Sequence, residues 1–372
     1  MCIRDSNLIW GFTTGAGIDK CYLQYHDIAS EDKNTQVYSV CININNINAD
    51  LTLLRQLGVK IIEINSKSDF SWLNKVKQNI EEVKPDIFFT HGFNGAIIAL
   101  LLRYFKGIDL PLVTTYHGLY HAPTSKKKIL EPIYNGLSRF VYKNLAKQTV
   151  CVEHMSRHFL IEKGVPENKL VTIHNGLKPI GRQQKIDLKS FNIPKKNLII
   201  LTASRITKVK GLNYLLEAIA DIKNKTKVLF TYVMIGDGPD ITKLKQIAAE
   251  LSILDFVSFI GYQNNIPSWL ESTDIFALPS LHEYHSIALL EAMRSGKAIV
   301  ATDVGGNGES IRNQKEGLLI PSKNVNALSI ALLKLIEDSS LRIQYGKAAK
   351  TRFENNFSEQ VMKRKLLKTI KS

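Results

Sequence analysis

The stretch PSLHEYHSIALLEAMRSGKAIVATDVGGNG, residues 279–308, decides the fold because it joins one apolar strand to the next through a charged loop and a helix. The residues before it, 274–278, are typical of a buried strand, and Ser286 is a suitable N-cap for a helix that runs to about Ser295. Glu283 then lies in the loop, and Glu291 lies in the helix, roughly 7 to 8 Å along its axis from the start. The free amides at the helix start suit an anion flanked by hydroxyl groups.

The same alternation of short β-rich runs and helical segments covers most of the chain. Ahead of residue 178 the β-rich runs are TQVYSVCI, VKIIEI, DIFFTH, LPLVTTYH, QTVCV and KLVTIH, and after residue 197 they are LIILTAS, VLFTYVMIG, DFVSFIG, DIFALPS, AIVATD and GLLIP. Such alternation predicts a parallel, doubly wound sheet in each half. The polar stretch 178–197 contains Pro179, Gly181 and Pro194 and is typical of a connection between domains. We therefore predict two Rossmann-like α/β domains, at residues 7–177 and 198–357, and a final helix within residues 358–372.

Two cations follow the first strand of the second domain. Arg205 comes directly after residues 198–204, and Lys210 precedes Gly211 at the start of the next helix. Arg can bind phosphate oxygens through two parallel hydrogen bonds, Lys supplies a compact charge, and Gly permits a close approach of the backbone. These residues predict a diphosphate site, with ordinary surface charges beside a helix start as the alternative.

These motifs resemble those of the retaining glycosyltransferases of family 4, whose signature is a Glu, seven residues, and a Glu followed by Ala-Met. LIILTASRITKVKG (198–211) resembles the family's strand, Arg, four residues and Lys-Gly, and VMIGDGP (233–239) its second strand and turn. VTIHNG (171–176) and TTYHG (114–118) resemble the end and the acceptor-side strand of its first domain. The resemblance implies the GT-B architecture, in which two Rossmann-like doubly wound domains face a cleft and the last helix crosses back to the first domain.

The resemblance also implies a function. The enzyme would move a hexose or N-acetylhexosamine, with retention of configuration, from a nucleoside-diphosphate sugar to a glycan or lipid-linked acceptor in cell-surface polysaccharide or glycolipid synthesis. Arg205 and Lys210 would hold the donor pyrophosphate and stabilise the departing nucleoside diphosphate. Glu291 would bind the ribose hydroxyls and Glu283 the hydroxyls of the donor sugar. The loop residues that would assist Glu283 are Tyr284, His285, Ser286 and Ile287.

Further residues acquire roles from the same resemblance. His117, which follows an apolar strand, would lie beside the anomeric carbon, with a structural histidine as the alternative. Tyr262 would stack on the nucleotide base, with core packing as the alternative. Gly236 would lie in the donor-binding turn after the second strand, and Gly15 and Gly17 in a loop that approaches the phosphates. Tyr284, His285 and Ser286 depart from the family's usual Gly and small residue after the first Glu, which puts the identity of the donor sugar in doubt.

The bulk composition sets limits on the class of protein. The chain has 372 residues, 44% hydrophobic and 22% charged, enough for two packed domains, and its net charge of +15 comes from dispersed Lys and Arg without a nucleic-acid-binding motif. The apolar run 96–102 is far shorter than the ~20 residues of a membrane span, and no secretory signal precedes Trp10. Four cysteines, Cys2, Cys21, Cys41 and Cys151, form no CxxC pair. We expect a cytoplasmic protein with reduced cysteines and no nucleic-acid partner.

The beginning of the chain is treated separately. MCIRDS, residues 1–6, resembles the translated remnant of a sequencing adapter, and we expect it to lie outside the fold. The first strand would then be shortened to residues 7–10.

One segment of the first domain combines positive charge with apolar residues at helical spacing. Between residues 121 and 147 the basic residues are Lys126, Lys127, Lys128, Arg139, Lys143 and Lys147, and the interleaved apolar residues are Ile129, Leu130, Ile133, Leu137, Phe140 and Val141. Such a helix could rest on an anionic membrane, at the inner face of the plasma membrane, or it could be a core-facing helix with a solvated basic side.

The sequence contains no Asp-x-Asp motif and no His/Cys/Asp cluster, so we expect neither a metal site nor a resident cofactor, with the nucleotide sugar as a co-substrate. Two rival functions remain at this point. One is an epimerase or hydrolase of sugar nucleotides on the same fold, and the other is a scaffold that binds a sugar nucleotide without turnover.

Overall fold

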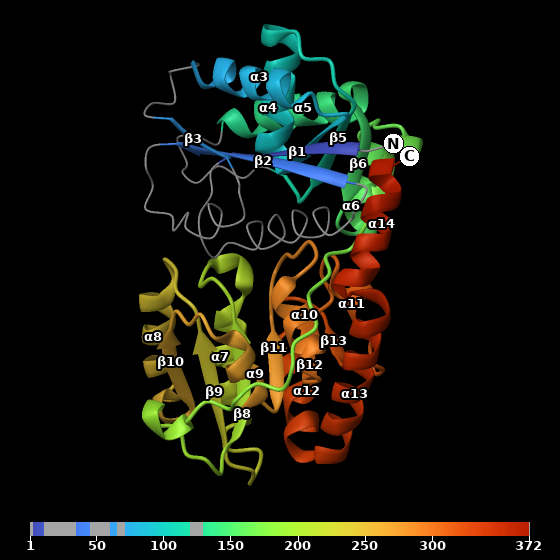
Figure 1. Cartoon of the computed structure of the whole chain (residues 1–372). Coiled ribbons are helices and arrows are strands. Elements are labelled where there is room, and N and C mark those ends of the chain that lie inside the picture. The colour runs from blue at the N-terminus through green and yellow to red at the C-terminus, as the bar shows by residue number, and fades with distance from the viewer. Residues whose placement is uncertain (1–2, 11–34, 45–59, 65–70, 120–128, 372) are drawn as a thin grey trace. The chain divides into compact units, whose positions relative to one another are not determined.

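The computed structural model describes residues 3–10, 35–44, 60–64, 71–119 and 129–371. The chain divides into two compact units (Figure 1). Unit 1 contains Met1–Asn175 and Glu359–Ser372, and unit 2 contains Gly176–Ser358. Gly15 and Gly17 of the predicted donor site lie outside the described residues.

Unit 1 is built on a parallel seven-stranded sheet with the order β3-β2-β1-β4-β5-β6-β7. Its strands are β1 (Ile3–Trp10), β2 (Thr35–Ile44), β3 (Lys60–Ile64), β4 (Ile87–His91), β5 (Leu112–Tyr116), β6 (Ala146–Cys151) and β7 (Leu170–Thr172). The strand order reverses between β1 and β4, which is the hallmark of a doubly wound sheet. The predicted fold class is confirmed for this half.

The first strand is longer than the sequence indicated. Residues 3–6, which we expected to lie outside the fold, form part of β1, and Ile3 and Ser6 pair with Thr35 and Tyr38 of β2. Apolar and polar residues alike can pair with a neighbouring strand, because the ladder of hydrogen bonds uses only backbone N–H and C=O groups. The expectation that residues 3–6 lie outside the fold, which rested on their resemblance to an adapter remnant, is therefore wrong.

The described helices of unit 1 contribute unequally to its apolar core. They are α3 (Ser71–Val83), α4 (Gly92–Lys106), α5 (Glu131–Phe140), α6 (His154–Glu162), α14 (Glu359–Lys371) and a π-helix, η2 (Val141–Leu145), that continues α5. The core joins Trp72 and Val76 of α3 to Phe88 of β4 and Ala96 of α4. Helix α14 ends the chain, yet it belongs to unit 1.

Unit 2 contains a parallel six-stranded sheet with the order β10-β9-β8-β11-β12-β13. Its strands are β8 (Leu198–Ala203), β9 (Phe230–Ile235), β10 (Val257–Gly261), β11 (Ile275–Leu278), β12 (Ala298–Thr302) and β13 (Leu318–Ile320). Each lies within a β-rich run identified from the sequence. The order reverses at β8, which lies between β9 and β11, so the loops after β8 and β11 are neighbours.

Helices cover both faces of this sheet. They are α7 (Leu212–Ile222), α8 (Ile241–Glu250), α9 (Ile266–Glu271), α10 (Ile287–Arg294), α11 (Asn307–Ser310), α12 (Val325–Glu337) and α13 (Ser339–Asn356). Along β8, Leu198 and Ile200 face one core with α7 and α12, whereas Ile199 and Leu201 face the other with α10 and α13. Because both faces are buried, the strands are continuous apolar runs without alternation of polar residues.

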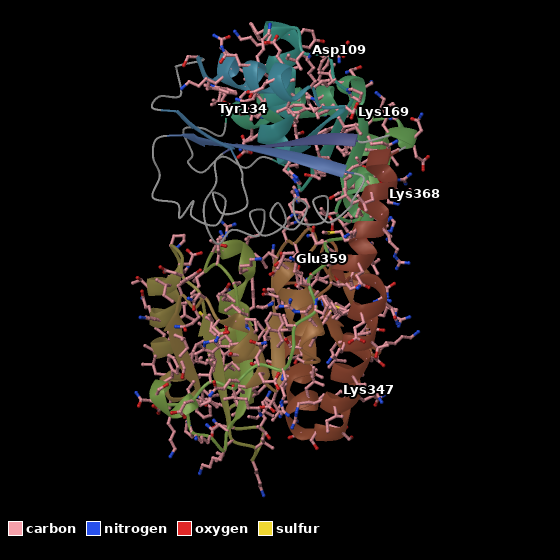
Figure 2. All side chains as sticks on the ribbon, viewed as in Figure 1. Asp109, Tyr134, Lys169, Lys347, Glu359 and Lys368 are labelled. Atoms are coloured by element: carbon pink, nitrogen blue, oxygen red, sulfur yellow. The ribbon has the colours of Figure 1, made fainter. Side chains whose placement is uncertain are left out.

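Short 3-10 turns complete the described secondary structure at Glu167–Lys169, Leu188–Phe191, Lys208–Lys210 and Leu254–Phe256. Charged side chains occupy the outer surfaces of the helices, as Figure 2 shows for Lys347 on α13 and Lys368 on α14. No helix in the described part of the chain combines the length and apolar character that crossing a bilayer requires.

Candidate active site

A buried ion pair lies where the loops after β8 and β11 meet. Lys210 Nζ donates to Glu283 Oε1 at 2.6 Å, and the side chains are 18% and 9% exposed. Ser280 Oγ donates to the same carboxylate oxygen at 2.6 Å. Glu283 is thus held in the loop by a cation and a hydroxyl, as a group that binds a ligand in a fixed geometry requires.

Backbone contacts explain how the two loops approach so closely. Leu281 N donates to Val209 O at 2.7 Å. Gly211 adopts φ 61°, and a Cβ there would lie 2.2 Å from Pro279 O. Only glycine fits this position, because any side chain would collide with backbone and separate the loops. Gly211 therefore permits the Lys210–Glu283 pair, and the helix α7 starts immediately after it.

The turn after β9 packs against the loop that carries Arg205. Gly236, at φ 135°, has its Cα so close to β8 that a Cβ would lie 1.8 Å from Ser204 O, and Ile206 N donates to Asp237 O at 2.8 Å. Arg205 is exposed beside this turn, and no hydrogen bond or ion pair of its guanidinium occurs within the described residues. Gly236 therefore shapes the turn, and Arg205 is available to an anion.

Helix α10 begins as predicted. Ser286 is its N-cap, and Ser286 Oγ accepts a hydrogen bond from Leu289 N at 3.4 Å. Leu289, Leu290 and Met293 are buried against the sheet, whereas Ile287 and Glu291 are half-buried. The negative charge of Glu291 opposes the lowering of the Arg294 pKa that burial causes, so the two side chains are close.

His285 of the same loop faces the interior of unit 2. His285 is 5% exposed, its Nε2 lies 3.3 Å from Ser310 Oγ, and its ring centroid lies 5.4 Å from that of Phe357. Gly306 N donates to Tyr284 O at 2.6 Å. These contacts hold the loop in place, and the structure thereby gives His285 the surroundings of a structural residue.

Three buried polar residues that sequence reasoning missed support this loop. Thr302 Oγ1 donates to Ser280 O at 2.6 Å, and Asn307 Nδ2 donates to Thr302 O at 3.0 Å. Ser280 contacts Glu283 directly, as described above. The position of Ser280 directly after an apolar strand was a usable signal, whereas Thr302 and Asn307 gave none without the tertiary contacts.

Tyr262 follows β10 at the carboxyl edge of the same sheet. Its side chain is 68% exposed, and Gly261 before it adopts φ 78°. The alternative that Tyr262 packs into the core is therefore wrong. An exposed aromatic ring at this edge is available for stacking.

A second polar cluster lies at the carboxyl ends of β4 and β5 in unit 1. The hydroxyl oxygen of Thr115 is 2.9 Å from His117 Nε2 and 3.2 Å from His91 Nδ1, and it accepts from Gly92 N at 3.2 Å. The two imidazole rings are stacked with centroids 6.2 Å apart. His91 was not singled out from the sequence, although its place at the end of a β-rich run was the same signal that identified His117.

Burial governs the charge of both histidines. It lowers the pKa of His117 from 6.5 to about 4. It also lowers the pKa of His91 well below 6.5, and repulsion from His117 adds to that shift. Both rings are therefore neutral at pH 7, and each carries a single N–H.

The chain is similar to known proteins along most of its length. The sequence profile of the glycosyl transferases group 1 matches residues 183–352, and that of glycosyltransferase family 4 matches residues 55–179. The amylovoran biosynthesis glycosyltransferase AmsK of Erwinia amylovora is 30% identical over 304 residues, which are 79% of this chain and 72% of that protein. The UDP-Gal:alpha-D-GlcNAc-diphosphoundecaprenol alpha-1,3-galactosyltransferase of Escherichia coli is 25% identical over 298 residues, 78% of this chain and 76% of that protein.

Solved structures show the same fold. HepE of Anabaena in complex with UDP superposes with a TM-score of 0.81 at 18% identity, over 99% of this chain and all of that one. The two parallel α/β sheets of the present chain are thus those of a GT-B glycosyltransferase. With both profiles matched in order and a relative at 30% identity, the chain belongs to the group 1 glycosyltransferases of family 4.

Proposed function

We propose that this glycosyltransferase moves a hexose or N-acetylhexosamine, with retention of configuration, from a nucleoside-diphosphate sugar to a glycan or lipid-linked acceptor. The observation that carries the proposal is the largely buried Lys210–Glu283 pair at the strand-order reversal of unit 2. Arg205, which has no charged partner among the described residues, lies on the same loop as Lys210. Ligands of open α/β sheets bind at such reversals, outside the carboxyl ends of the strands.

Each donor-binding residue has a role that matches its surroundings. Arg205 and Lys210 bind the pyrophosphate and stabilise the charge that develops on the leaving nucleoside diphosphate. Glu283, fixed by Ser280, accepts hydrogen bonds from the donor sugar. Glu291 accepts from the ribose, and the exposed ring of Tyr262 stacks on the base. The sequence offers no motif for a covalent carboxylate nucleophile, and we propose that the acceptor attacks on the side of the leaving group.

The two cations and the start of helix α7 replace a metal ion in this proposal. The transfer should therefore continue in excess EDTA at the rate measured without it. Loss of activity in EDTA, with recovery on addition of Mg²⁺ or Mn²⁺, would overturn metal independence.

The names of the relatives support the choice of donor and acceptor. One acts on a diphosphoundecaprenol-linked sugar with UDP-Gal, another belongs to amylovoran biosynthesis, and HepE binds UDP. We propose by this similarity a UDP-sugar donor and a role in cell-envelope polysaccharide or glycolipid synthesis on the cytoplasmic side of the membrane.

Calorimetric titration with UDP and GDP tests the donor site. We expect micromolar binding of UDP, weakened by Arg205→Ala and by Glu291→Ala. The matched controls are Lys347→Ala and Glu354→Ala, which remove exposed charges from α13 and should leave the affinity unchanged. Binding of neither nucleotide would sink the assignment of the donor site. Binding of the nucleotide without transfer of sugar to any acceptor would favour a scaffold. Release of a nucleotide sugar whose sugar has changed would favour an epimerase.

Helix α5 supports a further proposal, contact with an anionic membrane. Apolar residues in and just before it point to solvent, since Ile129, which precedes the helix, and Ile133 and Phe140 within it are 78%, 56% and 41% exposed. The alternative of a core-facing helix does not hold for these three residues, whereas Val141 at the end of the segment is buried in the core. Arg139 and Lys143 lie on the same segment, on the rim of a groove with Lys163 and Phe140. Exposed apolar residues flanked by cations are the features of a helix that lies in a membrane interface.

Vesicle sedimentation tests this contact. We expect binding to vesicles that contain phosphatidylglycerol and little binding to pure phosphatidylcholine. Ile133→Asp should abolish binding, and Arg139→Ala should weaken it about fivefold, since one cation near an anionic surface contributes ~1 kcal/mol. Ile343→Asp, an exposed apolar residue of α13, serves as the control. Equal binding of all variants would contradict the proposal.

A further inference from the structure

The Thr115 hydroxyl has a limited number of hydrogen-bonding positions, and its neighbours His91 and His117 compete for them. A threonine hydroxyl has one proton to donate and two lone pairs to accept with. The N–H of Gly92 occupies one lone pair of Thr115. One proton and one lone pair remain, and two imidazole nitrogens, His91 Nδ1 and His117 Nε2, lie within hydrogen-bond distance of them.

This count restricts the protonation of both rings. If both contacts are hydrogen bonds, one nitrogen must carry a proton and donate, and the other must be bare and accept. The two contacts use different ring positions, Nδ1 in His91 and Nε2 in His117. When His117 Nε2 carries the proton, His91 Nδ1 is bare, so both neutral rings are Nε2–H tautomers. In the opposite state both are Nδ1–H tautomers.

We infer that Thr115 couples the tautomers of His91 and His117, so that His91 acts as a positioning residue for the ring of His117. The site is well suited to this, because Thr115 is fully buried and His91 is 5% exposed. Because the two rings share the single hydroxyl of Thr115, neither ring is free to choose its tautomer independently.

The consequence for the reaction rests on the proposed function. In the Nε2–H pair, His117 has a bare Nδ1 that can take the proton of a sugar hydroxyl. The O–H bond breaks, its electron pair stays on oxygen, and an N–H bond forms at Nδ1, while the Nε2–H bond remains and continues to donate a hydrogen bond to Thr115 Oγ1. In the Nδ1–H pair, His117 can only donate. His91 and Thr115 thus decide whether His117 is a base.

Nuclear magnetic resonance of the full chain labelled with ¹⁵N-histidine tests the coupling. Long-range ¹H–¹⁵N correlations at pH 7.5 separate the two tautomers, and His91→Gln and His117→Gln assign the signals among the nine histidines. We expect both rings as Nε2–H. One ring of each kind in the wild-type protein would overturn the inference. Two Nδ1–H rings would uphold the coupling but overturn the role of His117 as a base, which separates the two claims.

Variants of Thr115 give a second measurement. Thr115→Val removes the hydroxyl at nearly constant volume, and we expect the tautomer of at least one ring to change. The expected loss in kcat is on the order of 10- to 100-fold with the donor KM unchanged, because only the proton-transfer step is affected. Thr115→Ser retains the hydroxyl and should restore both the tautomer pair and the rate. Unchanged tautomers in Thr115→Val would overturn the coupling even if the rate falls.

Discussion

At the scale of single residues, the Lys210–Glu283 pair joins stability to function. Its two members are 73 positions apart in the sequence, and both side chains are largely removed from water. A buried charge that loses its partner retains the cost of desolvation without the compensating attraction. The same pair is held in place by Ser280, so its geometry exists before any ligand arrives.

We predict that Lys210→Ala lowers both stability and rate. The free energy of unfolding should fall by about 3 kcal/mol, because Glu283 is left buried without its cation. The kcat of transfer should fall on the order of 10²- to 10³-fold through loss of charge stabilisation on the leaving group. Lys225→Ala is the matched control, since Lys225 also pairs at 2.6 Å, with Asp221, but on an exposed helix end. Urea unfolding and initial rates measure the two effects. Equal losses of stability and rate in both variants would contradict the assignment of Lys210 to the donor site.

The low pKa of His117 predicts acid sensitivity of unit 1. The folded pKa of about 4 lies below the unfolded value of 6.5, so between these values the unfolded chain binds more protons than the folded one. Stability is therefore complete above pH 6.5 and falls as the pH drops towards 4, by up to about 3 kcal/mol. His117→Gln should reduce this slope in melting temperatures measured from pH 7 to pH 4. His158→Gln, at an exposed position, should retain the wild-type slope.

At the scale of elements, the start of helix α10 combines capping with the position of a site residue. Ser286 satisfies the amide of Leu289, and the helix then carries Glu291 and the buried Leu290 and Met293. The cap fixes the direction of the first turn, and the first turn follows directly after the Glu283 loop. The local sequence therefore orients the acidic residues that follow and precede it.

Removal of this cap should affect the donor site as well as the helix. Ser286→Ala should lower the free energy of unfolding by about 1 kcal/mol, and we expect a several-fold weaker affinity for UDP. Asn324→Ala removes an equivalent cap from α12, where Asn324 Oδ1 accepts from Ala327 N at 2.9 Å. The Asn324→Ala variant should lose a similar amount of stability but keep the wild-type affinity for UDP. Calorimetric titration of both variants decides whether the cap serves the site.

At the scale of the whole molecule, unit 1 is assembled from segments at both ends of the chain. Helix α14 contributes Met362, Leu366 and Ile370, which are buried and spaced four residues apart on one face. This spacing places one apolar stripe along the helix. A domain that recruits the last helix of the chain cannot complete its core until the second domain has been synthesised.

We predict that α14 is required for the stability of unit 1. Leu366→Ala should lower the free energy of unfolding by about 2 to 5 kcal/mol, because Leu366 is only 1% exposed and the cavity removes contacts on all sides. Lys368→Ala, on the exposed side of the same helix, should change stability by less than about 0.5 kcal/mol (Figure 2). Variants that retain a single tryptophan, Trp72 in unit 1 or Trp269 in unit 2, report the two units separately by fluorescence in urea. A uniform loss in both signals would contradict the assignment of α14 to unit 1.

The sequence by itself determined the local features of this protein. Apolar runs predicted the positions of β2 to β13, and Ser286 predicted the start of α10. The donor-binding roles that the family motifs give to Arg205, Lys210, Glu283 and Glu291 stay predictions. These features depend on side-chain periodicity, capping and short motifs, which act over a few residues. For β1 the resemblance of residues 1–6 to an adapter remnant led us to leave out residues 3–6, which form half of the strand.

Only the tertiary structure decided which of these features meet. The order of the strands places β11 beside β8 and so pairs Glu283 with Lys210, and the packing of β4 beside β5 brings His91 to His117 through Thr115. It also turned His285 inward and left the apolar face of α5 in solvent. The physical reason is that such contacts join segments far apart in the chain, and their energies depend on burial and on partners that no local pattern specifies.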